Sequence, residues 1–495
     1  MNPAALTSAF DFITTPINTE HDFTVRVTVT NAAGSSRADT VALVPVELTK
    51  NYSDGATVSL VSGPVPASAN LSAGQSQTFV YAFRALTNGS VSFELEAVGT
   101  ESNLKTPAAS NLAQSNLVVI TNQGPLLWTF DDGGTTSSFY GSAAPQRNPL
   151  NEQVIYIGND NRKLYAIRIS DGVKKWEYTA ANPIKSTPYV RDYVVYFGDE
   201  SGNFYAVRDN TTSASLEWSR SVASAAIRTS ATRWVNESSE GRLYFASLDG
   251  KMYCRKASDG NSCTDWSDVS LGSPIYSTPA SANDGYIYVG ASNGTIAKVD
   301  RTSGNVIAMY AGYGGISASP FMYPKNPAVP LDGAWLWIGA LNGSVYKIDS
   351  TLPPGSEQVW SFSPSSPIPA QEFRNTIFVD VFSGGAGSLA VYAGNDNGCV
   401  YAISDEGEQM WKFPPGAEAI NGAVSGCILL DFTTNKLYFG AENHHYYALQ
   451  NSATAPTVIS GWPYYTGGPI VACPSLFGNV VMIPSTNGKI YAFTR

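Results

Sequence analysis

The sequence is poor in histidine and has no long apolar run. Its 495 residues include only three histidines, His21 and the adjacent pair His444 and His445. A hydrolase with a serine–histidine–aspartate triad would therefore have almost no histidine to use as its base. No stretch approaches about 18 consecutive apolar residues, so no transmembrane helix is predicted. The first twenty residues lack a basic start and an apolar core, so we expect that an export signal is not present in this chain.

Charge is also scarce, and cations are not clustered. Charged residues make up 14% of the chain, the formal net charge is −10, and the 30 Lys and Arg residues form no basic run. Nucleic-acid binding needs grouped cations along a surface, so no nucleic-acid partner is predicted. Gly, Ser, Thr, Asn and Tyr are abundant instead, and no long apolar stripe with a helical period occurs. This composition predicts an all-β protein of short strands and tight turns.

A repeated phrase dominates the rest of the sequence. GNDNRKLYAI starts at Gly158, and GNDNGCVYAI starts at Gly394. Six further copies align on one small residue, which we call position zero, and a tyrosine follows seven residues later in seven of the eight copies. The eight residues at position zero are Gly158, Gly198, Ala246, Gly290, Gly339, Gly394, Gly440 and Pro484. Asn, Asp and Gly between the two apolar segments of each copy predict a β-hairpin.

Each hairpin has two further strands beside it. An outer strand ends in an aromatic residue, and an inner strand follows a small residue and, in several copies, a proline. Four strands repeated eight times over residues 122–495 predict an eight-bladed β-propeller. The last copy stops at Arg495 without an outer strand, whereas GPLLWTF, with Trp128, supplies a spare one upstream of the first copy. We expect these two segments to pair and to close the ring, which leaves no open sheet edge.

The pattern Y-x-G-x-x-x-G-x-x-Y-A, followed by G-x-x-x-W, resembles the PQQ-type repeat of quinoprotein alcohol dehydrogenases and BamB-like outer-membrane assembly lipoproteins. The resemblance covers roughly residues 124–495. It implies that the outer-strand tryptophans dock between neighbouring blades, with Tyr310 as the exception. The matching residues are Trp128, Trp176, Trp218, Trp266, Trp360, Trp411 and Trp462.

The quinoprotein branch of this resemblance implies PQQ on the propeller axis. In that branch a vicinal disulfide and a tryptophan enclose the cofactor, and Glu, Asn and Asp hold Ca²⁺. No two cysteines are adjacent here, and the repeats leave little room for the long insertions that build such a site. We therefore predict no catalytic, cofactor-binding or metal-binding residues, and we keep a PQQ-dependent oxidoreductase with Ca²⁺ as an alternative. Aspartates in the hairpin turns are interpreted as turn residues rather than Ca²⁺ ligands.

The N-terminal quarter has a different pattern. Residues 20–121 alternate apolar and polar residues over several short segments, which predicts a β-sandwich of immunoglobulin-like type. It resembles the Ig-like modules of large bacterial surface proteins, which serve as stalks. Residues 1–19 are too few to fold alone. They are interpreted as an extension or the tail of a preceding domain, with strand insertion into a neighbouring copy as the alternative.

The five cysteines cannot all pair within one chain. Cys254 and Cys263 flank a turn at Asp259-Gly260 and are predicted to lie opposite each other, either as a disulfide or as two thiols. Cys399, Cys427 and Cys473 are predicted to be buried free thiols.

Two stretches interrupt the compact repeat, residues 311–335 and 363–390. Loops on a rigid scaffold often carry recognition, although their aromatic residues can equally pack on their own blades. The candidate contact residues are Tyr313, Phe321, Tyr323, Trp335 and Phe373.

The sequence therefore predicts a non-catalytic, exported binding or scaffold protein of the cell surface or envelope. Its expected partners are other envelope or surface proteins, and copies of itself. The alternatives are a subunit of an extracellular filament that pairs through residues 1–19, and the quinoprotein enzyme.

Overall fold

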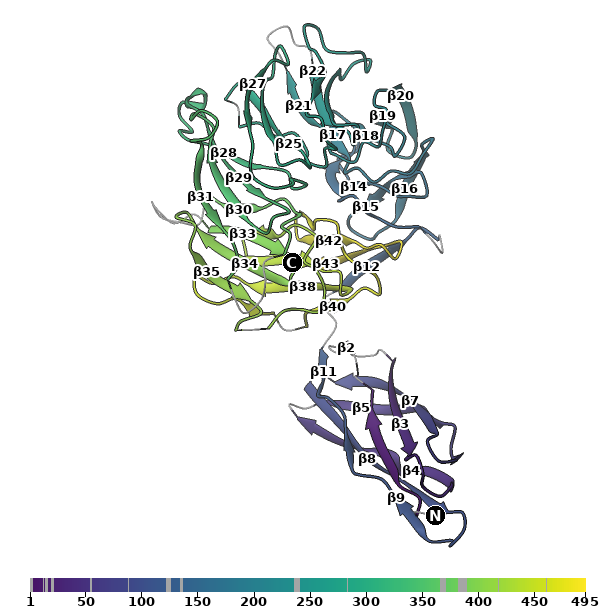
Figure 1. Cartoon of the computed structure of the whole chain (residues 1–495). Coiled ribbons are helices and arrows are strands. Elements are labelled where there is room, and N and C mark those ends of the chain that lie inside the picture. Colours follow the sequence, from purple (N-terminus) through teal and green to yellow (C-terminus); the bar gives the residue numbers. More distant parts are fainter. Residues whose placement is uncertain are drawn as a thin grey trace. The chain divides into compact units, whose positions relative to one another are not determined.

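The computed structural model describes the chain except residues 1–2, 12, 14–16, 19–21, 54–55, 88, 122–125, 134–136, 236–240, 283, 366–370, 382–389, 417 and 460. It divides into two compact units (Figure 1). The first comprises Met1–Gly124 with Ser460–Tyr465, and the second comprises Pro125–Ile459 with Thr466–Arg495. Both are built from strands, as the composition predicts. A single 3-10 turn, η1 (Pro330–Asp332), is the only helical element among the described residues.

The first unit has two β-sheets. One has the order β1-β3-β7-β5, and the other has the order β2-β11-β8-β4-β6, with β9 and β10 also paired to β8. Its strands are β1 (Leu6–Phe10), β2 (Ile17–Asn18), β3 (Asp22–Asn31), β4 (Ala38–Ser53), β5 (Thr57–Val65), β6 (Ala69–Leu71), β7 (Ser76–Thr87), β8 (Gly89–Glu101), β9 (Pro107–Ala109), β10 (Ala113–Gln114) and β11 (Val118–Thr121). A further short strand, β40 (Tyr464–Tyr465), lies in the segment Ser460–Tyr465.

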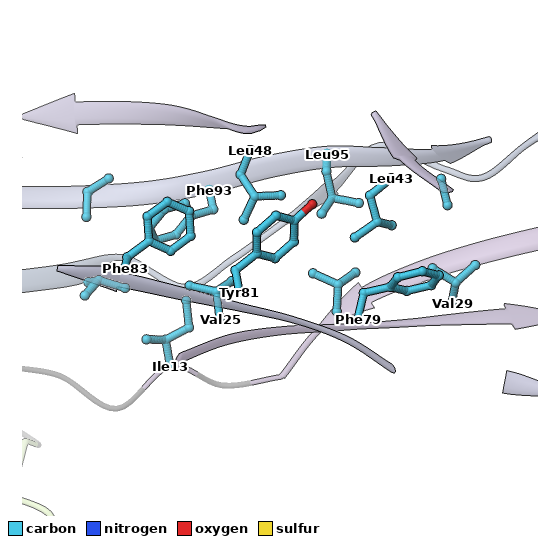
Figure 2. Close-up of a cluster of buried hydrophobic side chains, with 14 of the residues drawn as sticks. Ile13, Val25, Val29, Leu43, Leu48, Phe79, Tyr81, Phe83, Phe93 and Leu95 are labelled. Atoms are coloured by element: carbon cyan, nitrogen blue, oxygen red, sulfur yellow. The ribbon is translucent and has the colours of Figure 1, made fainter. Parts of the chain in front are cut away.

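Alternation along the strands creates the core between these sheets. In β3 the side chains of Val25, Val27 and Val29 are buried, and the residues between them are not. Figure 2 shows Tyr81 and Phe83 of β7 facing the strands of the opposite sheet. Because side chains of a strand alternate between its two faces, this two-residue period is what a half-buried sheet requires.

Residues 1–19 contribute strands to this unit, rather than standing apart from it as the sequence analysis expects. Strand β1 pairs antiparallel with β3, and β2 pairs parallel with β11. Asparagine side chains add to this attachment. Asn111 accepts a hydrogen bond from the Ser8 backbone N–H (3.0 Å) and donates one to the Ser8 carbonyl (3.1 Å). Asn116 makes the same two contacts with Ile13 (2.8 and 3.0 Å). Each amide thus replaces a strand partner.

The second unit contains, among its described residues, eight antiparallel sheets that follow one another along the chain (Figure 1). We number them sheets 1 to 8. Sheets 1 to 4 consist of β13 (Ala144–Arg147), β14 (Gln153–Gly158), β15 (Lys163–Arg168) and β16 (Lys174–Thr179); β17 (Tyr189–Arg191), β18 (Val194–Gly198), β19 (Asn203–Asp209) and β20 (Ala214–Ser221); β21 (Thr232–Val235), β22 (Gly241–Ala246), β23 (Lys251–Lys256) and β24 (Val269–Ser270); and β25 (Tyr286–Gly290), β26 (Ile296–Asp300) and β27 (Val306–Tyr310).

Sheets 5 to 8 continue the series. They consist of β28 (Phe321–Pro324), β29 (Ala334–Gly339), β30 (Val345–Asp349) and β31 (Gln358–Phe362); β32 (Phe378–Asp380), β33 (Ala390–Asn395), β34 (Cys399–Ser404) and β35 (Gln409–Phe413); β36 (Leu429–Asp431), β37 (Lys436–Gly440), β38 (His445–Gln450) and β39 (Thr457–Val458); and β41 (Ser475–Phe477), β42 (Val480–Pro484), β43 (Lys489–Thr494) and β12 (Leu126–Asp131).

Sheet 8 combines the two ends of this unit. Strand β12, which carries Trp128, pairs antiparallel with β43, with Thr129 opposite Tyr491 and Asp131 opposite Lys489. The predicted pairing of the Trp128 segment with the C-terminal strand is therefore confirmed. Residues more than three hundred positions apart in sequence share one sheet, and the C-terminal strand is not left as a free edge.

Sheet 4 departs from the predicted four strands. The inner position that β21 occupies in sheet 3 is reduced in sheet 4 to one isolated bridge between Ala280 and Tyr288. The described part of the chain has no helix long and apolar enough to cross a membrane.

Candidate functional site

The repeated tyrosine is held by the hairpin turn that precedes it. In five copies an asparagine three residues after position zero donates its side-chain N–H to the tyrosine hydroxyl at 2.7–2.9 Å. The same asparagines accept the backbone N–H two residues further on, at 3.0–3.2 Å. They are Asn161, Asn342, Asn397, Asn443 and Asn487. These amides stabilise the turn, which agrees with interpreting the turn residues as structural.

The outer-strand aromatics connect each sheet to the next one. Four tryptophans donate their indole N–H to a backbone carbonyl of the following sheet at 2.7–3.0 Å. These pairs are Trp128 with Ile169, Trp218 with Ala257, Trp360 with Asp405, and Trp411 with Ser452. The side chain of Trp176 instead bonds the Asp209 carboxylate (2.9 Å).

Tyr310 makes the same kind of contact with the next sheet as these tryptophans do, although the PQQ-type repeat has a tryptophan at this position. Its hydroxyl donates to the Ser350 carbonyl of sheet 5 (3.2 Å). Trp462, by contrast, follows β39 in the chain and lies outside any strand, although it is buried. Trp266 is also buried and lies in the turn before β24 rather than on a strand.

Glycine makes this docking possible. Gly172 and Gly260 have positive φ values (+73°), and a Cβ added to either would approach a tryptophan ring within 2.7 or 2.5 Å, that of Trp128 or Trp218 respectively. Only glycine combines that backbone conformation with such close approach at low cost.

A second set of sheet-to-sheet contacts precedes the inner strands. One residue in each sheet is a serine, threonine or cysteine, and we call this set the hydroxyl ring: Ser142, Thr187, Ser230, Thr278, Ser319, Thr376, Cys427 and Cys473. Four of its members give their backbone N–H to the side chain of the ring residue in the next sheet, at 2.8–3.0 Å. These donors are Ser142, Ser230, Thr278 and Cys473. These four contacts each join two neighbouring sheets through a backbone N–H and a side-chain oxygen.

Cys427 and Cys473 are joined by a disulfide, and the sequence-based prediction of two free thiols was wrong. They hold the same ring position in sheets 7 and 8, which brings their Cα atoms to 4.8 Å. The sequence does not reveal this pairing, because the two cysteines are 46 positions apart and meet only where two neighbouring sheets pack together. Cys399 is a buried thiol whose pKa is raised by burial.

The aromatics proposed as contact residues do not form a common surface. Tyr313 and Phe373 are buried, and the Tyr313 hydroxyl bonds the Glu357 carboxylate. Phe321, Tyr323 and Trp335 are partly buried against the core of sheets 5 and 6. These side chains therefore contribute mainly to packing, the alternative that the sequence also allowed. Parts of residues 363–390 lie outside the described residues.

A cavity of about 90 Å³ lies where the inner strand of sheet 4 is reduced. Its polar walls are Thr232 and Arg233 of β21 with Ser281 and Arg301 of sheet 4, and its apolar walls are Trp234, Tyr244 and Ile287. No pattern in the sequence indicates this site, because the shortened strand that creates it is visible only in the sheet pairing.

Two guanidinium groups face this cavity. The Arg301 guanidinium lies over the Trp234 ring, with its carbon 4.5 Å from the ring centre. The Nε of Arg233 is buried and has no hydrogen-bond partner, while Nη1 of Arg233 lies 3.8 Å from the Asp192 carboxylate. Cations stack favourably on an indole face, and each guanidinium retains donors for a planar acceptor.

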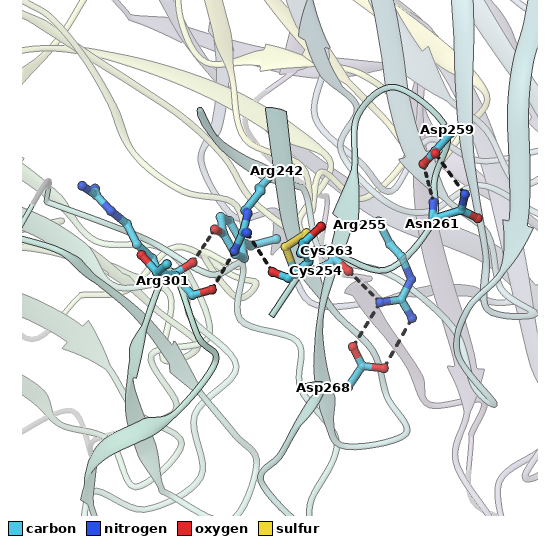
Figure 3. Close-up of a disulfide and its surroundings, with 11 residues drawn as sticks. Arg242, Cys254, Arg255, Asp259, Asn261, Cys263, Asp268 and Arg301 are labelled. Atoms are coloured by element: carbon cyan, nitrogen blue, oxygen red, sulfur yellow. Dashed lines mark hydrogen bonds and ion pairs between the residues drawn. A yellow bond between two sulfur atoms is a disulfide. The ribbon is translucent and has the colours of Figure 1, made fainter. Parts of the chain in front are cut away.

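The second disulfide supports one wall of the cavity (Figure 3). Cys254 and Cys263 are bonded, with their Cα atoms 5.5 Å apart. Next to Cys263, the Thr264 carbonyl accepts a hydrogen bond from buried Arg242 (2.8 Å), whose other nitrogen bonds the Thr302 carbonyl (2.7 Å). The disulfide thus fixes the loop that holds Arg242.

Tyr244 links the same wall to Arg301. Its hydroxyl donates to the Arg301 carbonyl (2.6 Å), and burial raises its pKa to about 12, so it remains a donor near neutral pH. Figure 3 shows the Arg301 side chain extending away from Arg242 and the disulfide. The backbone of Arg301 is therefore fixed, and its guanidinium is directed to the cavity.

The residues do not fit the quinone site that the repeat resemblance implies. Both disulfides join cysteines that are far from adjacent, 9 and 46 positions apart, so neither forms the flat vicinal platform. Within the described ranges no three His, Cys, Asp or Glu residues are placed to hold a metal ion. We therefore derive no chemical step through that cofactor.

Comparison with known proteins identifies the fold of the second unit. Residues 113–352 match the family model described as outer membrane protein assembly factor BamB. BamB from Moraxella catarrhalis is similar in structure, with a TM-score of 0.53 and 12% identity over 75% of this chain and 97% of that one. No curated protein sequence matches the chain.

Two further solved structures are similar. Sqt1 from Saccharomyces cerevisiae has a TM-score of 0.59 and 12% identity over 75% of this chain and 99% of that one. The computationally designed protein Ika8 has a TM-score of 0.53 and 14% identity over 75% of this chain and 100% of that one. At such identities the likeness shows the fold, a β-propeller of the BamB type, and not the activity.

Proposed function

We propose that this chain is a non-catalytic, exported protein of the cell surface or envelope whose propeller binds a protein partner. In this proposal the eight sheets are blades of one closed ring, and residues 20–121 form an Ig-like stalk. The observation that carries it is the placement of Arg301, whose guanidinium lies on Trp234 at a cavity and contacts no carboxylate among the described residues. An indole and a guanidinium held together at a surface are typical of binding sites.

Export is supported by the cysteines. Two disulfides form within the second unit, and disulfides persist in oxidising compartments such as the periplasm and the cell surface. The family model matched by residues 113–352 is described as an outer membrane assembly factor, which agrees with an envelope location.

The cysteine state in native cells tests export. Cells are lysed in acid to trap thiols, and the unfolded chain is alkylated and weighed. Exactly one alkylated cysteine, Cys399, is expected if the chain resides in an oxidising compartment. Alkylation of all five cysteines would show a reducing compartment and would remove the exported assignment.

Site-specific photo-crosslinking tests partner binding. A benzophenone amino acid replaces the exposed Thr302, next to Arg301, and a matched variant carries it at Val173, an exposed turn residue of sheet 1. The proposal predicts a discrete covalent adduct in native cells for position 302 and none for position 173. Equal labelling at both positions, or none at position 302, would contradict a partner-binding face there.

The filament hypothesis has one observation in its favour. Strand β1 is an edge strand at the N-terminal end of the first sheet, the topology from which a strand can be exchanged between copies. In this structure β1 is paired with β3 of its own chain. Sizing the chain with and without residues 1–19 distinguishes the two arrangements, because a filament subunit loses its assemblies on deletion.

A further inference from the structure

We propose that the cavity beside sheet 4 binds a carboxylate group carried by the partner polypeptide, with Arg233 and Arg301 as its ligands and Trp234 as the platform beneath. This inference rests on the proposed function, because it names the chemistry of the partner at that site. It does not depend on the export assignment, which concerns only where the chain resides.

The first argument is the unsatisfied donor on Arg233. Its Nε–H is buried without an acceptor, and a buried donor that lacks a partner costs free energy. Among the described residues the carboxylate paired with Arg233 is that of Asp192, which lies 3.8 Å from a different nitrogen, Nη1, and whose side chain is 70% exposed. An oxyanion that enters the cavity would accept from Nε, which Asp192 does not do.

The second argument is the position of Arg301. Its guanidinium carbon lies over the Trp234 ring, 4.5 Å from the ring centre, and the same side chain lines the cavity. Buried Arg242, whose guanidinium carbon lies 6.0 Å from the same ring, adds positive charge on that side. Planar guanidinium groups bind planar carboxylates through two parallel hydrogen bonds.

Size and lining select the ligand further. About 90 Å³ is room for roughly three water molecules, at about 30 Å³ each, which suits one carboxyl group with a short methylene stem and not a nucleotide. Ile287 and Tyr244 offer apolar contact to such a stem, and the hydroxyls of Thr232 and Ser281 lie among the walls. The chain as a whole carries a formal charge of −10, so this cationic cavity is a local exception that attracts an acidic group.

The test uses the full chain with glutarate as the probe, and inorganic phosphate as the competing anion, by calorimetry at low ionic strength. Glutarate is expected to bind, with affinity that falls as salt is added. The variant Arg301→Gln is expected to weaken binding roughly tenfold or more, since a hydrogen bond to a charged group contributes about that factor. Arg233→Lys keeps the positive charge but removes the planar set of guanidinium N–H donors, so this variant is also expected to bind glutarate more weakly.

The matched control is Arg191→Gln. Arg191 also pairs with Asp192, is exposed, and does not line the cavity, so this variant should bind glutarate as the parent does. Thermal unfolding of each variant shows whether it is folded. Glutarate binding that survives Arg301→Gln in a folded protein would overturn the assignment, and so would tighter binding of phosphate than of glutarate.

The two proposals fail separately. Photo-crosslinks at position 302 without glutarate binding would remove the carboxylate assignment and leave partner binding in place. Glutarate binding that depends on Arg301, together with no crosslink in native cells, would support the cavity chemistry and contradict the protein partner.

Discussion

Cys427 and Cys473 occupy one structural position in two neighbouring sheets and are joined by a disulfide, whereas four other pairs of neighbouring sheets are joined at this position by a backbone N–H that donates to a hydroxyl group. Sheet 8 is also the sheet in which the two ends of the second unit meet. The disulfide therefore links sheet 7 to sheet 8, the sheet that is formed by strands from both ends of the second unit.

Removing this disulfide should lower the stability of the second unit. Replacing Cys427 and Cys473 together by serine is expected to cost about 2–4 kcal/mol in the free energy of unfolding, because the bond closes a 46-residue separation. Replacing Cys254 and Cys263, which are 9 residues apart, should cost less. Denaturant unfolding followed by tryptophan fluorescence measures both, since nine of the ten tryptophans lie in the second unit. The reverse order of the two losses would contradict this account.

The cost of crowding a docked tryptophan can be measured separately from the cost of an unfavourable backbone conformation. Gly260 and Gly272 have nearly the same φ (+73° and +71°), but an added Cβ meets the Trp218 ring only at Gly260. Gly272→Ala should cost about 1–2 kcal/mol for its backbone conformation. Gly260→Ala should cost at least about 1 kcal/mol more, from overpacking. Unfolding midpoints and slopes report the difference, and equal costs would show that Trp218 does not dock tightly.

Asp396 should make stability depend on pH. Burial, together with the negative charges of Glu372 and Glu442, raises its pKa to about 6 against the lowering effect of Arg374. The folded state then takes up a proton at higher pH than the unfolded chain, so the free energy of unfolding falls as pH rises from about 4 through 6. Asp396→Asn should flatten this slope in urea titrations at several pH values.

Asp131 is the matched control for this measurement. A backbone N–H from Gly133 lowers its pKa, so Asp131→Asn should leave the slope between pH 4 and 6 unchanged. An unaltered slope in Asp396→Asn would contradict the role given to Asp396.

Deleting residues 1–19 should lower the stability of the first unit and leave that of the second unit unchanged. Strand β3 loses its partner β1, and the Asn111 and Asn116 amides lose the backbone groups they bond. Hydrogen exchange of β3 amides is expected to accelerate, whereas tryptophan-monitored unfolding of the second unit stays the same. Unchanged exchange in β3 would show that residues 1–19 are not part of this sheet.

The sequence predicts what repeats at fixed spacing. The tyrosine seven residues after position zero, the turn asparagines and the Trp128 strand are all local patterns, and the pairing of β12 with β43 follows from them. The sequence shows a small residue before several inner strands, but not the contacts that the hydroxyl ring makes between sheets, because the spacing of these residues from position zero varies. Thr187 stands 11 residues before Gly198, whereas Ser319 stands 20 residues before Gly339.

The candidate site was missed for a different reason. It forms because sheet 4 lacks a full inner strand beside β21, which depends on pairing between distant segments rather than on residue type. Arg233, Trp234 and Arg301 are ordinary in the sequence, and only their convergence at the cavity distinguishes them. The aromatic residues that stood out in the sequence, such as Phe373, are instead used in packing.

The proposed closure of the ring depends on the pairing of β12 with β43, and disulfide trapping tests that pairing directly. Asp131 and Lys489 are opposite each other in β12 and β43 and form an ion pair of 3.3 Å between exposed side chains. Asp131→Cys combined with Lys489→Cys should crosslink readily under mild oxidation, detected as a mass loss of two hydrogens and a shifted gel band. The pair Asp131→Cys with Lys251→Cys, placed in sheet 3, should not. Failure of the first pair to crosslink while both thiols remain reactive would contradict a closed ring.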